Sequence, residues 1–200
     1  MDRGESARGQ RNRARIAQLA ARLIAEHGLT DWNAAKRKAC RHLGLPDRET
    51  LPGNEEIQQA LRDYNTLFRS DEQPARLHRQ RTDALLWMER LSQWNPVLTG
   101  AVAGGWATPH SEIRLELEAE DAKAVELALI NAGVAYGLAP PGPGAPRQDH
   151  LRIECPEATL RVVIISPHER RSRPRRETGA SREERLTIAQ LRALLGPGAP

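Results

Sequence analysis

Residues 98–118, LTGAVAGGWATPHSEIRLELE, indicate the fold more strongly than any other part of the chain. The first part of the stretch is short, apolar and rich in glycine, and its last residues alternate between apolar and charged side chains. Ile113, Leu115 and Leu117 fall on one side of an extended chain, and the charged residues between them fall on the other. This period of two predicts a glycine-containing turn followed by a half-buried strand.

Helical periodicity dominates the chain before this stretch. Apolar side chains recur at helical spacing from Arg11 until Gly28, which acts as a stop signal. A second helix is expected after Thr30 or Asp31, either of which can cap it. A third is expected from Asn54 and a fourth over residues 73–93. The third helix is predicted to bury Ile57, Leu61, Tyr64 and Leu67.

Strands and helices mix after residue 118. Asp121 can cap a helix that runs to Ala132, and residues 134–139 read as a short strand. The segments HLRIEC and ATLRVVIIS predict a hairpin around Pro156-Glu157, preceded by a proline-rich loop at 140–148. A last helix begins at Thr187, where a capping box is predicted, and it is expected to bury Leu191, Leu194 and Leu195.

These elements predict an α+β protein with a helical N-terminal part, a small mixed sheet and a C-terminal helix. The expected organisation is a disordered tail at 1–10, a helical segment at 11–94 and an α/β core at 95–168. An Arg-rich linker at 169–185 and a C-terminal helix with its tail at 186–200 complete it.

Composition narrows the class of protein. The chain has 200 residues, a formal net charge of +4 and only two cysteines, Cys40 and Cys155, which are far apart and read as reduced thiols. No apolar run reaches the roughly 18 residues needed to cross a bilayer, and the N-terminus lacks the apolar part of a signal peptide. We therefore expect a cytoplasmic protein with no membrane partner.

The opening stretch resembles the signature of the polymerase-beta-like nucleotidyltransferases, especially the minimal ones, whose pattern runs approximately G-S-x-A-R-G-x-A-x-x-x-S-D-I-D-L. The register holds without a gap over residues 100–115, and the order of elements fits over 85–166. The helical block at 11–80 is not a standard piece of that fold; it resembles the N-terminal region of proteobacterial proteins that carry a similar SDIN-like strand. The matching residues are Gly100, Ala103, Gly105, Ala107, Ser111, Ile113 and Leu115.

In such a family the glycine lets the backbone approach a triphosphate, and the serine supplies a hydroxyl and an amide to phosphate oxygens. Two acids at positions i and i+2 of the strand hold divalent metal, and a third acid on a neighbouring strand completes the site. The resemblance therefore implies a nucleotidyltransferase-like topology, a nucleoside triphosphate as donor and magnesium as cofactor.

The sequence departs from the family pattern where the chemistry would occur. Ala101 replaces the serine, Glu112 replaces the first aspartate, and Arg114 replaces the second. A guanidinium beside the proposed metal repels a divalent cation and favours a carboxylate or a phosphate. The natural position for the third acid is Arg161, which leaves Glu154 as the substitute.

The leading hypothesis is therefore a degenerate nucleotidyltransferase-like protein, a pseudoenzyme that lacks metal-dependent transfer and retains a nucleotide or phosphate pocket. If activity survives, Glu112 and Glu154 are the catalytic residues, with Glu112 as a magnesium ligand. The predicted pocket is lined by Gly100, Ala101, Gly105, Ser111, Glu112 and Arg114, with Arg161 or Glu154 opposite.

A second hypothesis comes from a different class, a non-enzymatic module that binds nucleic acid or a protein partner. The segment AAKRKACRHLG places Lys36, Arg37, Lys38, Arg41 and His42 on a short helix that follows a glycine-containing turn. Residues 169–176 hold five arginines. The same features also fit an ordinary exposed basic face and a solvated linker.

Overall fold

The structure, a computed structural model, describes residues 2–46, 50–139, 149–172 and 185–196. The chain forms two compact units. Unit 1 comprises residues 1–73 together with 108–110, and unit 2 comprises residues 74–107 and 111–200. No helix within the described ranges is long and apolar enough to cross a membrane.

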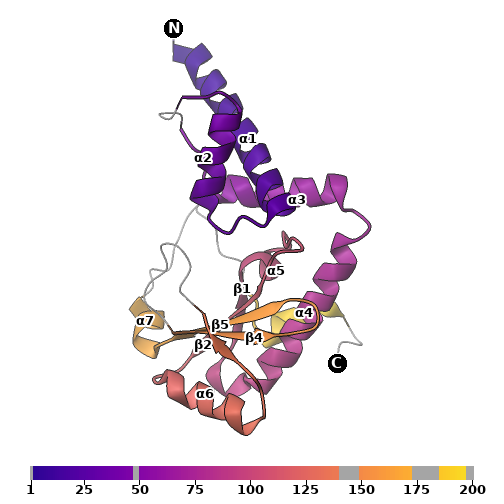
Figure 1. The fold of residues 1–200 in the computed structure, drawn as a ribbon, viewed down its shortest axis with the longest axis vertical. Coiled ribbons are helices and arrows are strands. Elements are labelled where there is room, and N and C mark those ends of the chain that lie inside the picture. The colour runs from indigo at the N-terminus through magenta and orange to yellow at the C-terminus, as the bar shows by residue number, and fades with distance from the viewer. Residues whose placement is uncertain (1, 47–49, 140–148, 173–184, 197–200) are drawn as a thin grey trace. The chain divides into compact units, whose positions relative to one another are not determined.

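Unit 1 is built from three helices, α1 (Asp2–His27), α2 (Trp32–His42) and α3 (Asn54–Phe68) (Figure 1). The expectation of a disordered tail at 1–10 is wrong for residues 2–10, because α1 already begins at Asp2. The other two helices start where the sequence predicted. The Asp31 side chain caps α2 by accepting hydrogen bonds from the backbone N–H groups of Asn33 and Ala34.

Small and branched side chains fill the interior of unit 1. Fully buried side chains come from all three helices: Ile16, Ala20 and Ala21 of α1, Ala35 and Ala39 of α2, and Ile57 and Leu61 of α3. Two expectations fail at the edge of this interior. Leu67, predicted to be buried, is 73% exposed. Lys36, predicted on a basic surface, is buried and donates a hydrogen bond to Asn54 Oδ1 at 2.8 Å.

Unit 2 contains a five-stranded mixed sheet in the order β1-β2-β5-β4-β3. Only the β2–β5 pair is parallel, and the other neighbours are antiparallel. The predicted strand at 111–118 and the predicted hairpin around Pro156-Glu157 are confirmed. The strands are β1 (Val97–Thr99), β2 (Ile113–Glu118), β3 (Gly137–Leu138), β4 (Asp149–Glu154) and β5 (Thr159–Ile165).

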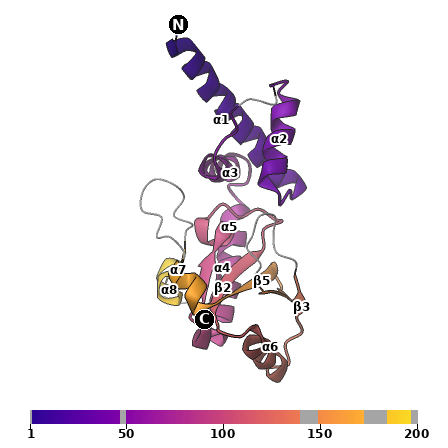
Figure 2. The same ribbon diagram turned by 90° about the vertical axis from the view of Figure 1, so that its left-hand side faces the viewer.

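Helices α4 (Gln73–Arg90), α6 (Ala122–Asn131) and α8 (Ile188–Leu195) contribute to the core on one face of the sheet (Figure 2). Alternation along the strands places Ile113, Leu115 and Leu117 in that core and leaves the charged residues of β2 on the opposite face. A short 3₁₀-helix (Ser92–Trp94) precedes β1, and α5 (Gly100–Gly104) follows it.

The C-terminal part differs from its prediction in two places. Residues 169–172, expected in a linker, belong to α7 (Pro167–Ser172), and Leu186 exchanges two backbone hydrogen bonds of 2.9 Å with Leu98 of β1. The capping box of Thr187 and Gln190 is confirmed, but Leu194 is exposed. The predictions for residues 140–148, 173–184 and 197–200 lie outside the described residues.

The boundary between the units also differs from the prediction. The expected helical segment ended at residue 94, whereas α4 belongs from Pro74 onward to unit 2. Leu85 and Met88 of α4 are fully buried in the core that covers the sheet, which explains the assignment. The fold class is thus α+β as expected, with the last helix of the N-terminal series serving as a cover for the sheet.

Candidate functional site

The face of the sheet opposite the core carries a row of three arginines. Strand register places Arg114 of β2 beside Arg161 of β5, and Arg161 beside Arg152 of β4. Thr99 of β1 continues the row beyond Arg114. Because neighbouring strands are about 4.8 Å apart, the three guanidinium groups start from adjacent positions on one surface.

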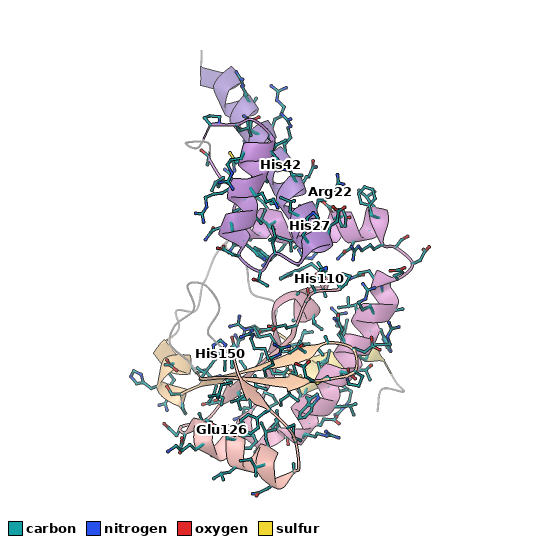
Figure 3. All side chains as sticks on the ribbon, in the orientation of Figure 1. Arg22, His27, His42, His110, Glu126 and His150 are labelled. Carbon is teal, nitrogen blue, oxygen red and sulfur yellow. The ribbon has the colours of Figure 1, made fainter. Side chains whose placement is uncertain are left out.

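Like charges directly opposite each other destabilise a sheet, so each arginine in the row needs a compensating anion. Arg161 has the strongest compensation. Its Nε and Nη2 atoms donate to the two carboxylate oxygens of Glu112, at 2.5 and 3.1 Å. His150, which is buried, places Nδ1 at 3.4 Å from Arg161 Nη1, where it can accept a hydrogen bond (Figure 3 labels His150).

The two outer arginines differ in how well they are compensated. Arg152 lies 2.8 Å from Glu154, and both side chains are exposed. For Arg114, the one carboxylate within 4.0 Å in the described ranges is that of Glu116, at 4.0 Å. Glu116 is itself buried and lies 2.8 Å from Arg185, which takes part of its charge. The Nε atom of Arg114 is buried and has no hydrogen-bond partner within the described part of the chain.

Arg114 is therefore the cation of the row with the weakest compensation. Its side chain remains 41% exposed, so an incoming anion can reach it. The partly exposed guanidinium of Arg114, which has only a long carboxylate contact among the described residues, can still offer charged N–H donors to phosphate oxygens. Chemically, the row is suited to binding an anion.

The same residues do not fit a magnesium site. Both oxygens of Glu112 accept hydrogen bonds from Arg161, and Glu154 lies on β4, two strands from β2, a backbone separation of about 10 Å. No group of three or more His, Cys, Asp or Glu within the described ranges could hold a metal ion. A fixed positive charge at Arg114 opposes a divalent cation further.

The residues expected to line a phosphate pocket separate into two places. Gly100 follows Thr99, the neighbour of Arg114, and Ser111 immediately precedes Glu112, so both adjoin the arginine row. Ala101 is buried in the hydrophobic core. Gly105 lies at the other end of α5, where its N–H donates to the carbonyl of Ala101.

The surroundings of Gly105 give it a structural role. Its φ of +75° suits a glycine, and it ends α5 in the left-handed region. Arg81 of α4 donates hydrogen bonds to the carbonyls of Val102 and Ala103 at 3.0 and 3.1 Å. This guanidinium satisfies the carbonyl end of α5 and lies 3.6 Å from where a Cβ at position 105 would be.

The basic helix of the second hypothesis is α2. Its Lys36 points into unit 1, and burial lowers the pKa of Lys36 from its ordinary 10.5. Arg37, Arg41 and His42 are exposed. In the Arg-rich segment, Arg170 forms an ion pair with Glu118 at 2.6 Å, and residues 173–176 lie outside the described residues.

Three residues in or around the arginine row were not predicted from the sequence as part of a site: Arg152, His150 and Arg185. A hairpin centred on Pro156-Glu157 pairs positions 152 and 161, so its expected register could have revealed Arg152. The same register places His150 opposite Val163. Arg185 carried no such signal, because it reaches Glu116 from a segment with no periodic pattern.

Comparison of the chain with models of known protein families gives no match, and a search of curated proteins gives none either.

Proposed function

We propose that unit 2 is a degenerate nucleotidyltransferase-like domain that binds the phosphates of a nucleotide on its arginine row and does not catalyse metal-dependent transfer. The observation that carries the proposal is the register Arg114–Arg161–Arg152, in which Arg114 has no carboxylate closer than 4.0 Å among the residues that the structure describes. A nucleoside triphosphate supplies the missing negative charge. The topological half of the proposal rests on the ungapped signature at residues 100–115 and on β5 being the direct neighbour of β2.

The proposed loss of transfer follows from the identity of two side chains. Positions 114 and 161, where the family pattern calls for acids, hold arginines that lie next to each other in the sheet. Arginine does not lose its charge at any physiological pH. The face therefore attracts the free anionic nucleotide without needing a metal as an intermediary.

Isothermal titration calorimetry of the full chain with ATP, GTP, CTP and UTP, in magnesium and in EDTA, tests the proposal. We expect at least one nucleotide to bind in EDTA at least as tightly as in magnesium, because the arginines interact most strongly with uncomplexed phosphates. Arg114→Ala should weaken that binding by about tenfold, the effect of losing one charge-assisted phosphate contact. Arg37→Ala removes the same charge from α2 and serves as the matched control.

Two results would contradict the proposal. One is the absence of binding by all four nucleotides, or binding that Arg114→Ala leaves unchanged. The other is release of pyrophosphate at an ordinary turnover rate, on the order of 1 s⁻¹ or faster, with any acceptor. Salt-sensitive retention of RNA or DNA that is lost in Arg37→Ala and not in Arg114→Ala would favour the nucleic-acid module instead.

A further inference from the structure

A groove in unit 1 lies outside the proposed function. It has a volume of about 730 Å³ and runs between α1 and α3. Such a volume falls in the range of ordinary binding pockets. Its apolar lining consists of Leu19, Leu43, Ala60, Tyr64, Leu67 and Phe68.

The wall of the groove protrudes into solvent. Leu67 and Phe68 at the end of α3 are 73% and 70% exposed. The ring of Phe68 is held against the ring of Tyr64 at a centroid distance of 4.9 Å, and Tyr64 donates a hydrogen bond to Glu26 at 3.0 Å. A pocket for a small molecule would enclose such side chains, whereas a hollow with an aromatic knob at its edge is the shape of a protein interface.

The charges around the groove are divided between its two sides. On α1, Arg22 is compensated by Glu26 at 3.0 Å, but Arg15 has no ion-pair partner within the described part of the chain. On α3, Asp63 accepts a hydrogen bond from the neutral amide of Gln59 and has no cationic partner there. One edge thus offers an uncompensated cation and the other an uncompensated anion.

This surface carries a groove, the protruding ring of Phe68 and charges of both signs. Such a surface is complementary to itself under a two-fold rotation. In a two-fold dimer each residue contacts its partner's counterpart reciprocally, and such dimers are the commonest protein oligomers. The rotation places Phe68 of one copy opposite the groove of the other. It also allows the cationic edge of one copy to lie against the anionic edge of the other.

We propose that this face is a homodimer interface in which Phe68 of each copy enters the groove of the other and Arg15 pairs with Asp63 across the two-fold axis. The proposal concerns unit 1 alone and is independent of the proposed nucleotide site. It accounts for two large apolar side chains that the isolated chain leaves in water, an arrangement that soluble monomers avoid when the patch is extensive.

Sedimentation equilibrium of the full chain from about 5 to about 500 μM tests it, since a modest interface dissociates in this range. We expect the mass to rise from 22.3 kDa toward twice that value. Phe68→Ser should raise the dissociation constant on the order of 100-fold, because each dimer loses two aromatic anchors. Leu127→Ser, at a position 57% exposed on α6, is the matched control and should leave the dimer intact.

Charge reversal tests the reciprocal arrangement. Arg15→Glu and Asp63→Arg should each weaken self-association about tenfold, because each creates two like-charge contacts in the dimer. An equimolar mixture of the two variants should form a heterodimer, because both contacts are then between opposite charges. Circular dichroism melting of each variant checks that the fold is retained.

The proposal is overturned by a chain that stays monomeric at every concentration, by a dimer that Phe68→Ser does not weaken, or by one that Leu127→Ser weakens equally. It is also overturned if the mixture of Arg15→Glu and Asp63→Arg associates no better than either variant alone.

Discussion

The guanidinium of Arg161 donates hydrogen bonds to both carboxylate oxygens of Glu112, at 2.5 and 3.1 Å. Arg161 lies near the start of β5, and Glu112 immediately precedes β2. This pair occupies both carboxylate oxygens of Glu112. A divalent cation would have to displace a bidentate guanidinium before it could use Glu112, and it would then face Arg114 as well. The pair therefore opposes the binding of a divalent cation at Glu112.

We predict that the Arg161–Glu112 pair contributes measurable coupling to the free energy of unfolding. A double-mutant cycle with Arg161→Gln and Glu112→Gln, measured by urea denaturation, should give a coupling of about 1 kcal/mol, because the pair is bidentate and Arg161 is only 20% exposed. The control cycle uses Arg152 and Glu154, whose side chains are 54% and 70% exposed, and should give less than about 0.5 kcal/mol. Equal coupling in both cycles would argue against a special role for the pair.

We predict that two substitutions convert the arginine row into a cation site. Arg114→Asp together with Arg161→Asp would place two carboxylates on adjacent positions of β2 and β5 and release Glu112 to join them. The double variant should bind Mn²⁺ with a dissociation constant on the order of 0.1–1 mM, whereas the unmodified chain should not. Electron paramagnetic resonance measures free Mn²⁺ directly. Arg37→Asp with Arg41→Asp makes the same change of net charge on α2 and should gain no binding.

The partly buried carboxyl group of Asp83 predicts a pH dependence of stability. Burial raises the pKa of Asp83 above its ordinary 3.8, and the carboxylate of Glu157 adds to the rise, while a hydrogen bond from the backbone of Glu157 opposes it. The folded chain therefore holds a proton that the unfolded chain has lost, so stability falls as pH rises from 3.8 through the folded-state pKa.

Asp83→Asn should remove this fall in stability with rising pH. The variant should gain stability relative to the unmodified chain as pH rises through that window, and the gain should stay constant at higher pH. Urea denaturation of the variant and of the unmodified chain at a series of pH values measures this gain. A difference for Asp83→Asn that does not change with pH would show that the group is not shifted.

Two glycines of unit 1 with the same backbone angle should respond differently to alanine. Gly28 and Gly44 both have φ of +65°, but a Cβ at Gly28 would lie 2.9 Å from Cγ of His110, whereas nothing lies within 4 Å at Gly44. Gly44→Ala should lower the free energy of unfolding by about 1 kcal/mol from backbone strain alone. Gly28→Ala should lower it by about 2–3 kcal/mol, because the clash adds to the strain.

A chain that carries His110→Ala separates the effect of the contact with His110 from the effect of backbone strain at Gly28 (Figure 3 labels His110). In a chain that carries His110→Ala, the further change Gly28→Ala should cost no more than Gly44→Ala does. Thermal and urea denaturation give both differences. An undiminished effect of Gly28→Ala in that background would place its cause elsewhere.

Local signals in the sequence determined most of the elements. The alternation of Ile113, Leu115 and Leu117 gave a correct strand and a correct buried face, because side-chain direction in an extended chain depends only on position. Asp31 and Thr187 marked helix starts correctly, because a capping side chain bonds to N–H groups two or three residues away. At residues 2–10 and 169–172 a polar composition was mistaken for the absence of a helix.

Only the tertiary structure decided which of these elements belong together. It assigned α4 to the sheet, brought Arg161 beside Arg114, and placed Arg185 against Glu116 across almost 70 residues of sequence. It also exposed Leu67, which helical periodicity alone had assigned to the interior. Periodicity fixes the direction of a side chain within its own element, whereas strand order and long-range ion pairs depend on which surfaces pack and exclude water. No local pattern in the chain encodes that choice.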